Sequence, residues 1–157
     1  MKVVTKDSEK KLLEVVSGLK TDPGGYYALH FNLSLLTEQY RSDYQIKIAV
    51  NILNDLFKAQ DSITFSMRDS DIVLLYNGTN RGLLEKAIFQ LRYLFMDDPL
   101  GYSEDGLENE DFCTVYDLEF QWRDFFYACK RKAGYDPNST SITPAQNAPE
   151  QTTPQTT

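Results

Sequence analysis

The chain has 157 residues, of which 41% are hydrophobic and 13% aromatic, and its formal net charge is −7. This length and apolar content indicate one packed domain and exclude a globally disordered chain. Residues 97–124 carry ten acidic side chains and one basic one, and no basic stripe offsets them, so we expect no nucleic-acid partner.

The N-terminal residues lack the apolar core of a signal peptide, and no apolar run reaches the length of a membrane span. Cys113 and Cys129 make neither a disulfide framework nor a zinc site, and we expect both to be small buried hydrophobes. We therefore expect a cytoplasmic protein with no membrane partner, no cofactor and no metal.

The first predicted element is a helix over residues 8–19, with an apolar residue at each helical turn, and the Asp-Pro-Gly-Gly segment 22–25 ends it. A strand with alternating apolar residues follows over 26–33. The second helix covers 42–58 and has Ser42 or Asp43 as its N-cap. Two strands, 63–67 and 72–76, then form a hairpin around the polar turn 68–71.

The third helix runs from the Asn-Gly-Thr-Asn segment 77–80 to about Phe95, and an acidic loop over 97–111 follows it. The last strand covers 112–118. The last helix covers 120–132 and ends in three basic residues, which suit its dipole. Residues 136–157 contain almost no large apolar side chain, so we expect a globular domain over 1–135 and a disordered tail over 136–157.

The strand and helix order β-α-β-β-α-β is typical of the ferredoxin-like fold. The sequence therefore predicts an α+β domain with a four-stranded antiparallel sheet and helices on one face. The first and last helices are additions to that plan. Because this fold hosts many unrelated functions, the function must be argued from the site residues.

The segment from 26 to 95 resembles a degenerate diguanylate-cyclase (GGDEF-like) domain. Its helix 42–58, hairpin 63–76 and helix 80–95 follow the family's order, and Ser70-Asp71 with the apolar strand after it lies where the family has Asp-Glu-Phe. The family's two glycines are replaced by Arg68-Asp69 or Asp69-Ser70. Its first-strand metal Asp has no counterpart, because His30 and Asn32 occupy the candidate positions. The resemblance therefore implies a catalytically inactive domain, which either retains nucleotide binding or serves only as a protein-contact module.

The polar turn is one candidate binding site. Arg68, Asp69 and Asp71 have the charges to hold a phosphate or a metal, but Asp and Ser are also ordinary turn residues whose side chains bond their own backbone. His30, the only histidine, has no catalytic partner identifiable from the sequence, so we expect a structural or exposed histidine.

The acidic segment and the last helix are candidate interaction surfaces. The acidic loop lacks EF-hand spacing, so we expect a solvated loop or a docking surface for a basic partner. The aromatic residues of the last helix either pack in the core or form a partner or dimer interface. The candidate interaction residues are Glu104, Asp105, Glu108, Glu110, Asp111, Trp122, Phe126 and Tyr127.

The sequence contains no complete catalytic set, so we expect a non-catalytic regulatory or protein-interaction domain, in signalling, with a protein partner or a second copy of itself. One alternative is a nucleotide-binding regulator or weak Mg²⁺-dependent nucleotide enzyme that uses Arg68 and Asp71. Another is a structural subunit of an oligomeric assembly, in which the last helix packs on a second copy.

Overall fold

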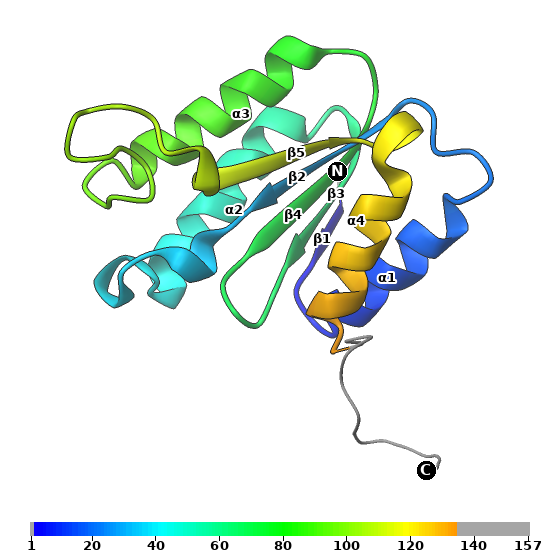
Figure 1. Cartoon of the computed structure of the whole chain (residues 1–157), viewed down its shortest axis with the longest axis horizontal. Helices are drawn as coiled ribbons and strands as arrows, with labels where there is room; N and C mark the ends of the chain where they lie inside the picture. Colours follow the sequence, from blue (N-terminus) through cyan, green and yellow to red (C-terminus); the bar gives the residue numbers. More distant parts are fainter. Residues whose placement is uncertain (1, 135–157) are drawn as a thin grey trace, which may run out of the picture.

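The computed structural model describes residues 2–134, which form a five-stranded mixed sheet with helices on both faces (Figure 1). The strand order is β1-β3-β4-β2-β5. The strands are β1 (Lys2–Val4), β2 (Tyr26–Phe31), β3 (Asp61–Ser66), β4 (Ile72–Asn77) and β5 (Cys113–Asp117). The helices are α1 (Ser8–Gly18), α2 (Asp43–Phe57), α3 (Arg81–Leu94) and α4 (Leu118–Lys132).

The structure confirms an α+β domain but corrects the expected sheet. β3, β4, β2 and β5 pair antiparallel, whereas β1 adds a fifth strand parallel to β3, with Val3 opposite Thr64. This strand was not predicted, because three residues are too few to show an alternation of apolar side chains. The sheet therefore differs from a simple four-stranded ferredoxin-like sheet. Residues 136–157, predicted as a disordered tail, lie outside the described residues.

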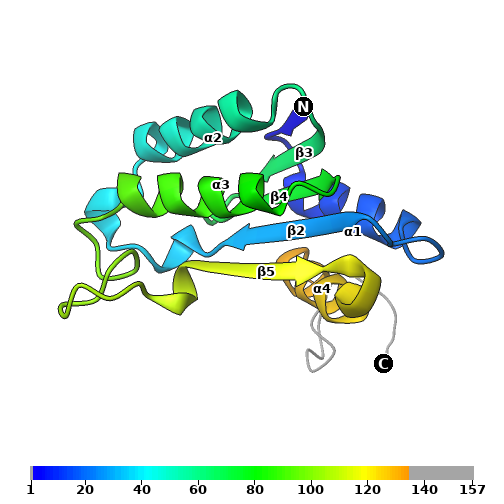
Figure 2. The same cartoon turned by 90° about the horizontal axis from the view of Figure 1, so that it is seen from above.

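Two apolar layers hold the domain together, one on each face of the sheet (Figure 2). α2 and α3 bury Leu53 and Leu91 against one face, while α1 and α4 bury Val16 and Phe125 against the other. The expectation of helices on one face was wrong, because β4 is apolar on both sides and needs a cover on each. Five of its residues are buried: Ile72, Val73, Leu74, Leu75 and Tyr76.

Side-chain caps fix the starts of three helices. Ser42 accepts a hydrogen bond from the Gln45 amide at the start of α2, as predicted, and Asn80 accepts one from the Leu83 amide at the start of α3. Asp117 caps α4, which therefore begins at Leu118 and not at residue 120. The predicted strand 26–33 ends at Phe31, because residues 33–35 form a short 3₁₀ turn.

The acidic loop is built around two buried charged side chains. The Asp98 carboxylate accepts hydrogen bonds from the amides of Thr37 and Leu100, each at 2.8 Å, and from the Thr37 hydroxyl. The Arg92 guanidinium donates to the carbonyls of Gly101 and Asn109 at 2.9 and 2.8 Å. These contacts place the loop beside the end of α3. No helix within residues 2–134 is long and apolar enough to cross a bilayer.

Candidate functional site

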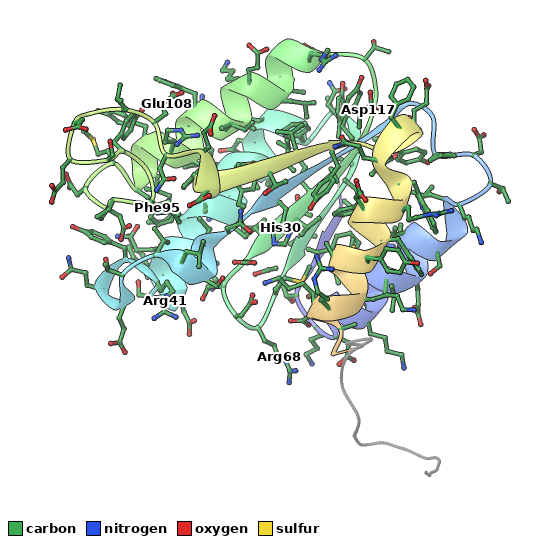
Figure 3. The ribbon with its side chains drawn as sticks, viewed as in Figure 1. His30, Arg41, Arg68, Phe95, Glu108 and Asp117 are labelled. Carbon is green, nitrogen blue, oxygen red and sulfur yellow. The ribbon has the colours of Figure 1, made fainter. Side chains whose placement is uncertain are left out.

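A partly buried cluster of polar and charged side chains lies between the sheet and the end of α4, and we call it the Asp71 cluster. It consists of His30 on β2, Asp69 and Asp71 in the β3–β4 hairpin, and Lys132 in the last turn of α4. His30 points to this side because Ala28, two residues earlier, packs beneath α1 and α4. Figure 3 labels His30 on the sheet.

Asp71 is the centre of the cluster and is 1% exposed. One oxygen, Oδ1, accepts a hydrogen bond from the Ser34 amide at 2.7 Å. The other, Oδ2, accepts one from His30 Nε2 at 2.8 Å and one from Lys132 Nζ. A buried carboxylate is tolerated only when it is paired and hydrogen-bonded, and here both oxygens are.

The contacts of Asp71 also set its charge. Burial alone raises the pKa of Asp71, but hydrogen bonds from His30, Lys132 and Ser34 outweigh it and bring the pKa from 3.8 down to about 2. Burial lowers the pKa of Lys132, but hydrogen bonds from this ammonium to Asp69 and Asp71 outweigh that and raise it. The carboxylate and the ammonium are therefore both charged near neutral pH.

The cluster ties together β2, the turn after it, the hairpin and α4. Because the ionised Asp71 carboxylate can only accept, His30 Nε2 is the donor in their contact. No group of three or more His, Cys, Asp or Glu residues that suits a metal occurs within residues 2–134.

The three residues predicted to form the turn site do not act together. Asp69 and Asp71 both contact Lys132, whereas Arg68 lies in the exposed turn, and its backbone amide donates to Glu9 at 2.9 Å (Figure 3). The ordinary-turn interpretation does not describe Asp71, because its side chain turns inward. Local sequence patterns could not indicate that His30 pairs with Asp71, because 41 residues separate them.

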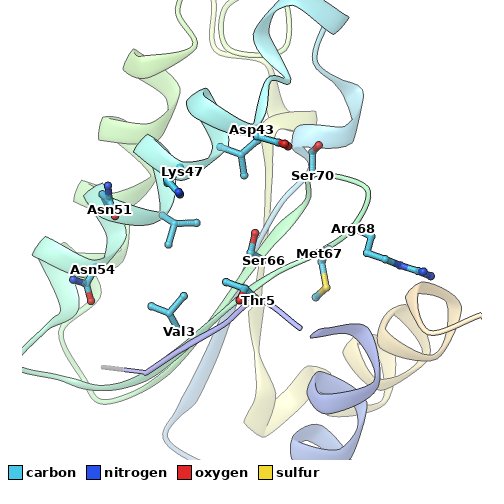
Figure 4. Close-up of a pocket in the computed structure, with 12 residues that line it drawn as sticks. Val3, Thr5, Asp43, Lys47, Asn51, Asn54, Ser66, Met67, Arg68 and Ser70 are labelled. Carbon is cyan, nitrogen blue, oxygen red and sulfur yellow. The ribbon is translucent and has the colours of Figure 1, made fainter. Parts of the chain in front are cut away.

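A groove of about 400 Å³ lies between α2, β1 and the hairpin (Figure 4). Lys47, Asn51 and Asn54 line it from α2, and Val3 and Thr5 line it from the β1 side. Arg68 and Ser70 close it at the hairpin end. Of the three candidate turn residues, Arg68 lines this groove, and Asp69 and Asp71 are not among its lining residues.

No family model, curated protein or solved structure matches this chain. The function is therefore argued from the residues of this chain alone.

The two thiols are not reactive sites. Burial raises the pKa of Cys113 and that of Cys129 to about 12, so both stay protonated. Cys129 is buried, as predicted, whereas Cys113 is only partly buried.

Two of the predicted aromatic interaction residues are engaged inside the domain. Trp122 stacks on Phe126, with ring centroids 4.7 Å apart, and its Nε1 donates to the Val16 carbonyl of α1 at 2.8 Å. Tyr127 is 48% exposed. The acidic candidates Glu104, Asp105, Glu108, Glu110 and Asp111 are mostly exposed on the loop beside α3.

Sequence reasoning missed an exposed apolar surface on α3, which we call the α3–β5 patch. Phe89, Tyr93 and Met96 are 57%, 60% and 47% exposed, and the first two rings are stacked with centroids 6.5 Å apart. Val115 of β5 is 43% exposed. The signal was present as the i, i+4, i+7 spacing of the α3 residues, beside the wider stripe that forms the core.

Proposed function

We propose that this chain is a non-catalytic protein-interaction domain that uses the α3–β5 patch. The observation that carries the proposal is the pair of stacked, more than half exposed rings of Phe89 and Tyr93 on α3, with Met96 and Val115 also about half exposed. Single exposed apolar residues are ordinary, but exposed aromatic rings that stack on each other are typical of a protein interface.

Two features support placing the patch at one edge. Arg92 contacts the Phe112 ring at 5.0 Å, just before β5, so this flank of α3 faces β5. Phe89 lies three residues before Arg92, on the same flank, and Met96 follows the end of α3. Val115 pairs with Leu29, which is buried beneath α2 and α3, so Val115 points to the α3 side as well.

The burial and hydrogen bonding of Asp71 support the proposal that the domain is non-catalytic. Both Asp71 oxygens already accept hydrogen bonds, and the side chain is buried. A carboxylate that serves Mg²⁺ or a triphosphate needs an oxygen that faces the ligand. Within this proposal the cluster fixes α4 to the sheet, and the β2–α2–β3–β4–α3–β5 unit is a ferredoxin-like core extended by β1.

A photo-crosslinking phenylalanine analogue in place of Phe89 tests the proposal in the cells that make the protein. We expect a discrete adduct with another protein chain. The same analogue in place of Tyr44, which is 73% exposed on α2, is the matched control and should give none. Absence of an adduct at position 89, or equal adducts at both positions, would argue against an interface on this patch.

Nucleotide binding is the second candidate function, and the groove between α2 and the hairpin is the observation that favours it. We would measure the melting temperature with guanine and adenine mono-, di-, tri- and cyclic dinucleotides, with and without Mg²⁺. A ligand at 100 times its dissociation constant stabilises the folded chain by about 2.7 kcal/mol. A shift that Lys47→Ala and Arg68→Ala both remove would favour this function over the first.

A further inference from the structure

The outer edge of β5 is an unpaired strand edge. Within residues 2–134, β5 pairs with β2 alone, and β2 lies between β4 and β5 in the sheet. The Asn32 amide donates to the Phe112 carbonyl at 2.9 Å, which fixes the alternation of the ladder. Thr114 and Tyr116 therefore bond to β2, and the backbone groups of Cys113 and Val115 point away from it.

Val115 joins the strand edge to the exposed apolar residues on the α3 side of the sheet. Its outward backbone groups belong to the edge, and its side chain, which is 43% exposed, points to the face that α3 covers. An added strand would thus gain main-chain hydrogen bonds and apolar contacts together. This combination is the usual physical basis of recognition by strand addition.

The charge around this edge is acidic at both ends. Glu110 and Asp111 precede β5, and Asp117 and Glu119 follow its central residues. Two positive charges lie nearby, because Arg92 is 3.8 Å from Glu108 and Arg81 is 5.6 Å from the ring of Tyr27, the residue opposite Asp117. The carboxylates at the two ends of β5 outnumber them. The surface is therefore complementary to a segment that is apolar in the middle and basic at its ends.

The same charges argue against a second copy of this chain. Antiparallel pairing of two β5 edges about Val115 would bring Glu110 and Asp111, which precede β5 in one copy, near Asp117 and Glu119 of the other, at both ends of the pair. The repulsion between these carboxylates disfavours the pair. Residues 135–157 are no better suited, because they contain Asp136 and Glu150 and no Lys or Arg.

We infer that the β5 edge, with the α3–β5 patch beside it, binds an extended segment of another protein whose centre is apolar and whose two ends carry Lys or Arg. This inference rests on the proposed function and names its partner class.

The test selects short random peptides displayed on phage against the full chain and measures the selected peptides, made synthetically, by fluorescence anisotropy. We expect β-branched or aromatic residues in alternation, with basic residues at both ends. Val115→Pro removes an outward amide that β2 does not use, so it should spare the fold and weaken binding by about tenfold or more. Circular dichroism and the melting temperature check that the fold is retained.

Two further variants separate charge from shape. Glu110→Gln with Asp111→Asn keeps the side-chain sizes and should weaken binding several-fold, and added salt should do the same to the unmodified chain. Phe89→Ser with Tyr93→Ser changes only exposed positions, so it keeps the inference testable if Val115→Pro fails to fold. Lys47→Ala, in the groove near β1 at the opposite edge of the sheet, is the matched control and should leave binding unchanged.

Several results would overturn the inference: no enriched peptide, enrichment of acidic peptides, or peptides that bind the Val115→Pro and Phe89→Ser/Tyr93→Ser variants as tightly as the unmodified chain. Concentration-dependent dimerisation that Val115→Pro abolishes would identify a second copy as the occupant instead. If the crosslinker at position 89 captures a protein but none of the selected peptides depends on β5, the proposed function stands and the strand-addition inference fails. If both experiments are negative, both fail.

Discussion

His30 Nε2 and Asp71 Oδ2 lie 2.8 Å apart in the interior of the domain, although 41 residues separate them in the chain. The contact joins β2 to the β3–β4 hairpin, and Lys132 joins α4 to the same carboxylate. The single carboxylate thus links the sheet to the last helix. This contact adds to the apolar packing of Phe125 and Cys129, which holds α4 against the same face of the sheet.

Asp71→Asn should therefore destabilise the domain strongly. The amide keeps the shape but removes the charge, and it leaves the Lys132 ammonium facing a neutral group. We expect a loss of about 2–4 kcal/mol in the free energy of unfolding, measured with urea at neutral pH. Asp69→Asn is the control, because Asp69 is more exposed than Asp71 and the side-chain oxygen of the asparagine can still accept a hydrogen bond from the Asp71 backbone amide. Equal losses of stability in the two variants would contradict this account.

The same carboxylate should make stability depend on acid. The pKa of Asp71 is lower in the folded chain, at about 2, than its ordinary value of 3.8, so the folded state binds the proton less readily than the unfolded state. The ionised Asp71 carboxylate therefore contributes about 2 kcal/mol to the free energy of unfolding. This contribution is present above pH 4 and is lost as the pH falls from about 4 to 2.

Chemical unfolding at a series of pH values measures this effect. Asp71→Asn should flatten the profile between pH 4 and pH 2, while Asp69→Asn should retain most of it. A variant profile that falls as steeply as that of the unmodified chain would assign the acid sensitivity to other carboxylates.

Trp122 should act as a structural contact between α1 and α4. Its indole Nε1 donates to Val16 and its ring stacks on Phe126, so Trp122→Ala should cost about 2–4 kcal/mol, measured by thermal or urea unfolding. Phe120→Ala, at a 79% exposed position two residues away, is the control and should change stability little. If Trp122→Ala alters only the oligomeric state, measured by sedimentation, the residue belongs to an interface between copies.

The sequence predicted the local elements better than their assembly. Ser42 and the alternation of residues 26–31 were enough to place α2 and β2, because capping and periodicity are local properties. β1 was not predicted because it is short. The Asp71 cluster was not predicted for another reason. The sequence pattern places Asp71 in a hairpin turn, but whether its side chain is buried depends on how β2 and α4 pack against that turn.

The hairpin turn gives the last prediction. Ser70 has a φ of 84°, in the left-handed region that glycine adopts without strain, and its amide donates to the Met67 carbonyl at 3.3 Å. Ser70→Gly should therefore stabilise the domain by about 0.5–1 kcal/mol, since relief of strain exceeds the added entropy of the unfolded chain. Gly25 has a similar φ of 85°, and a Cβ there would lie 3.2 Å from Asn77, so Gly25→Ala should destabilise the domain. Urea unfolding of the two variants should give shifts of opposite sign, and a destabilising Ser70→Gly would mean that the serine hydroxyl contributes more than the turn geometry costs.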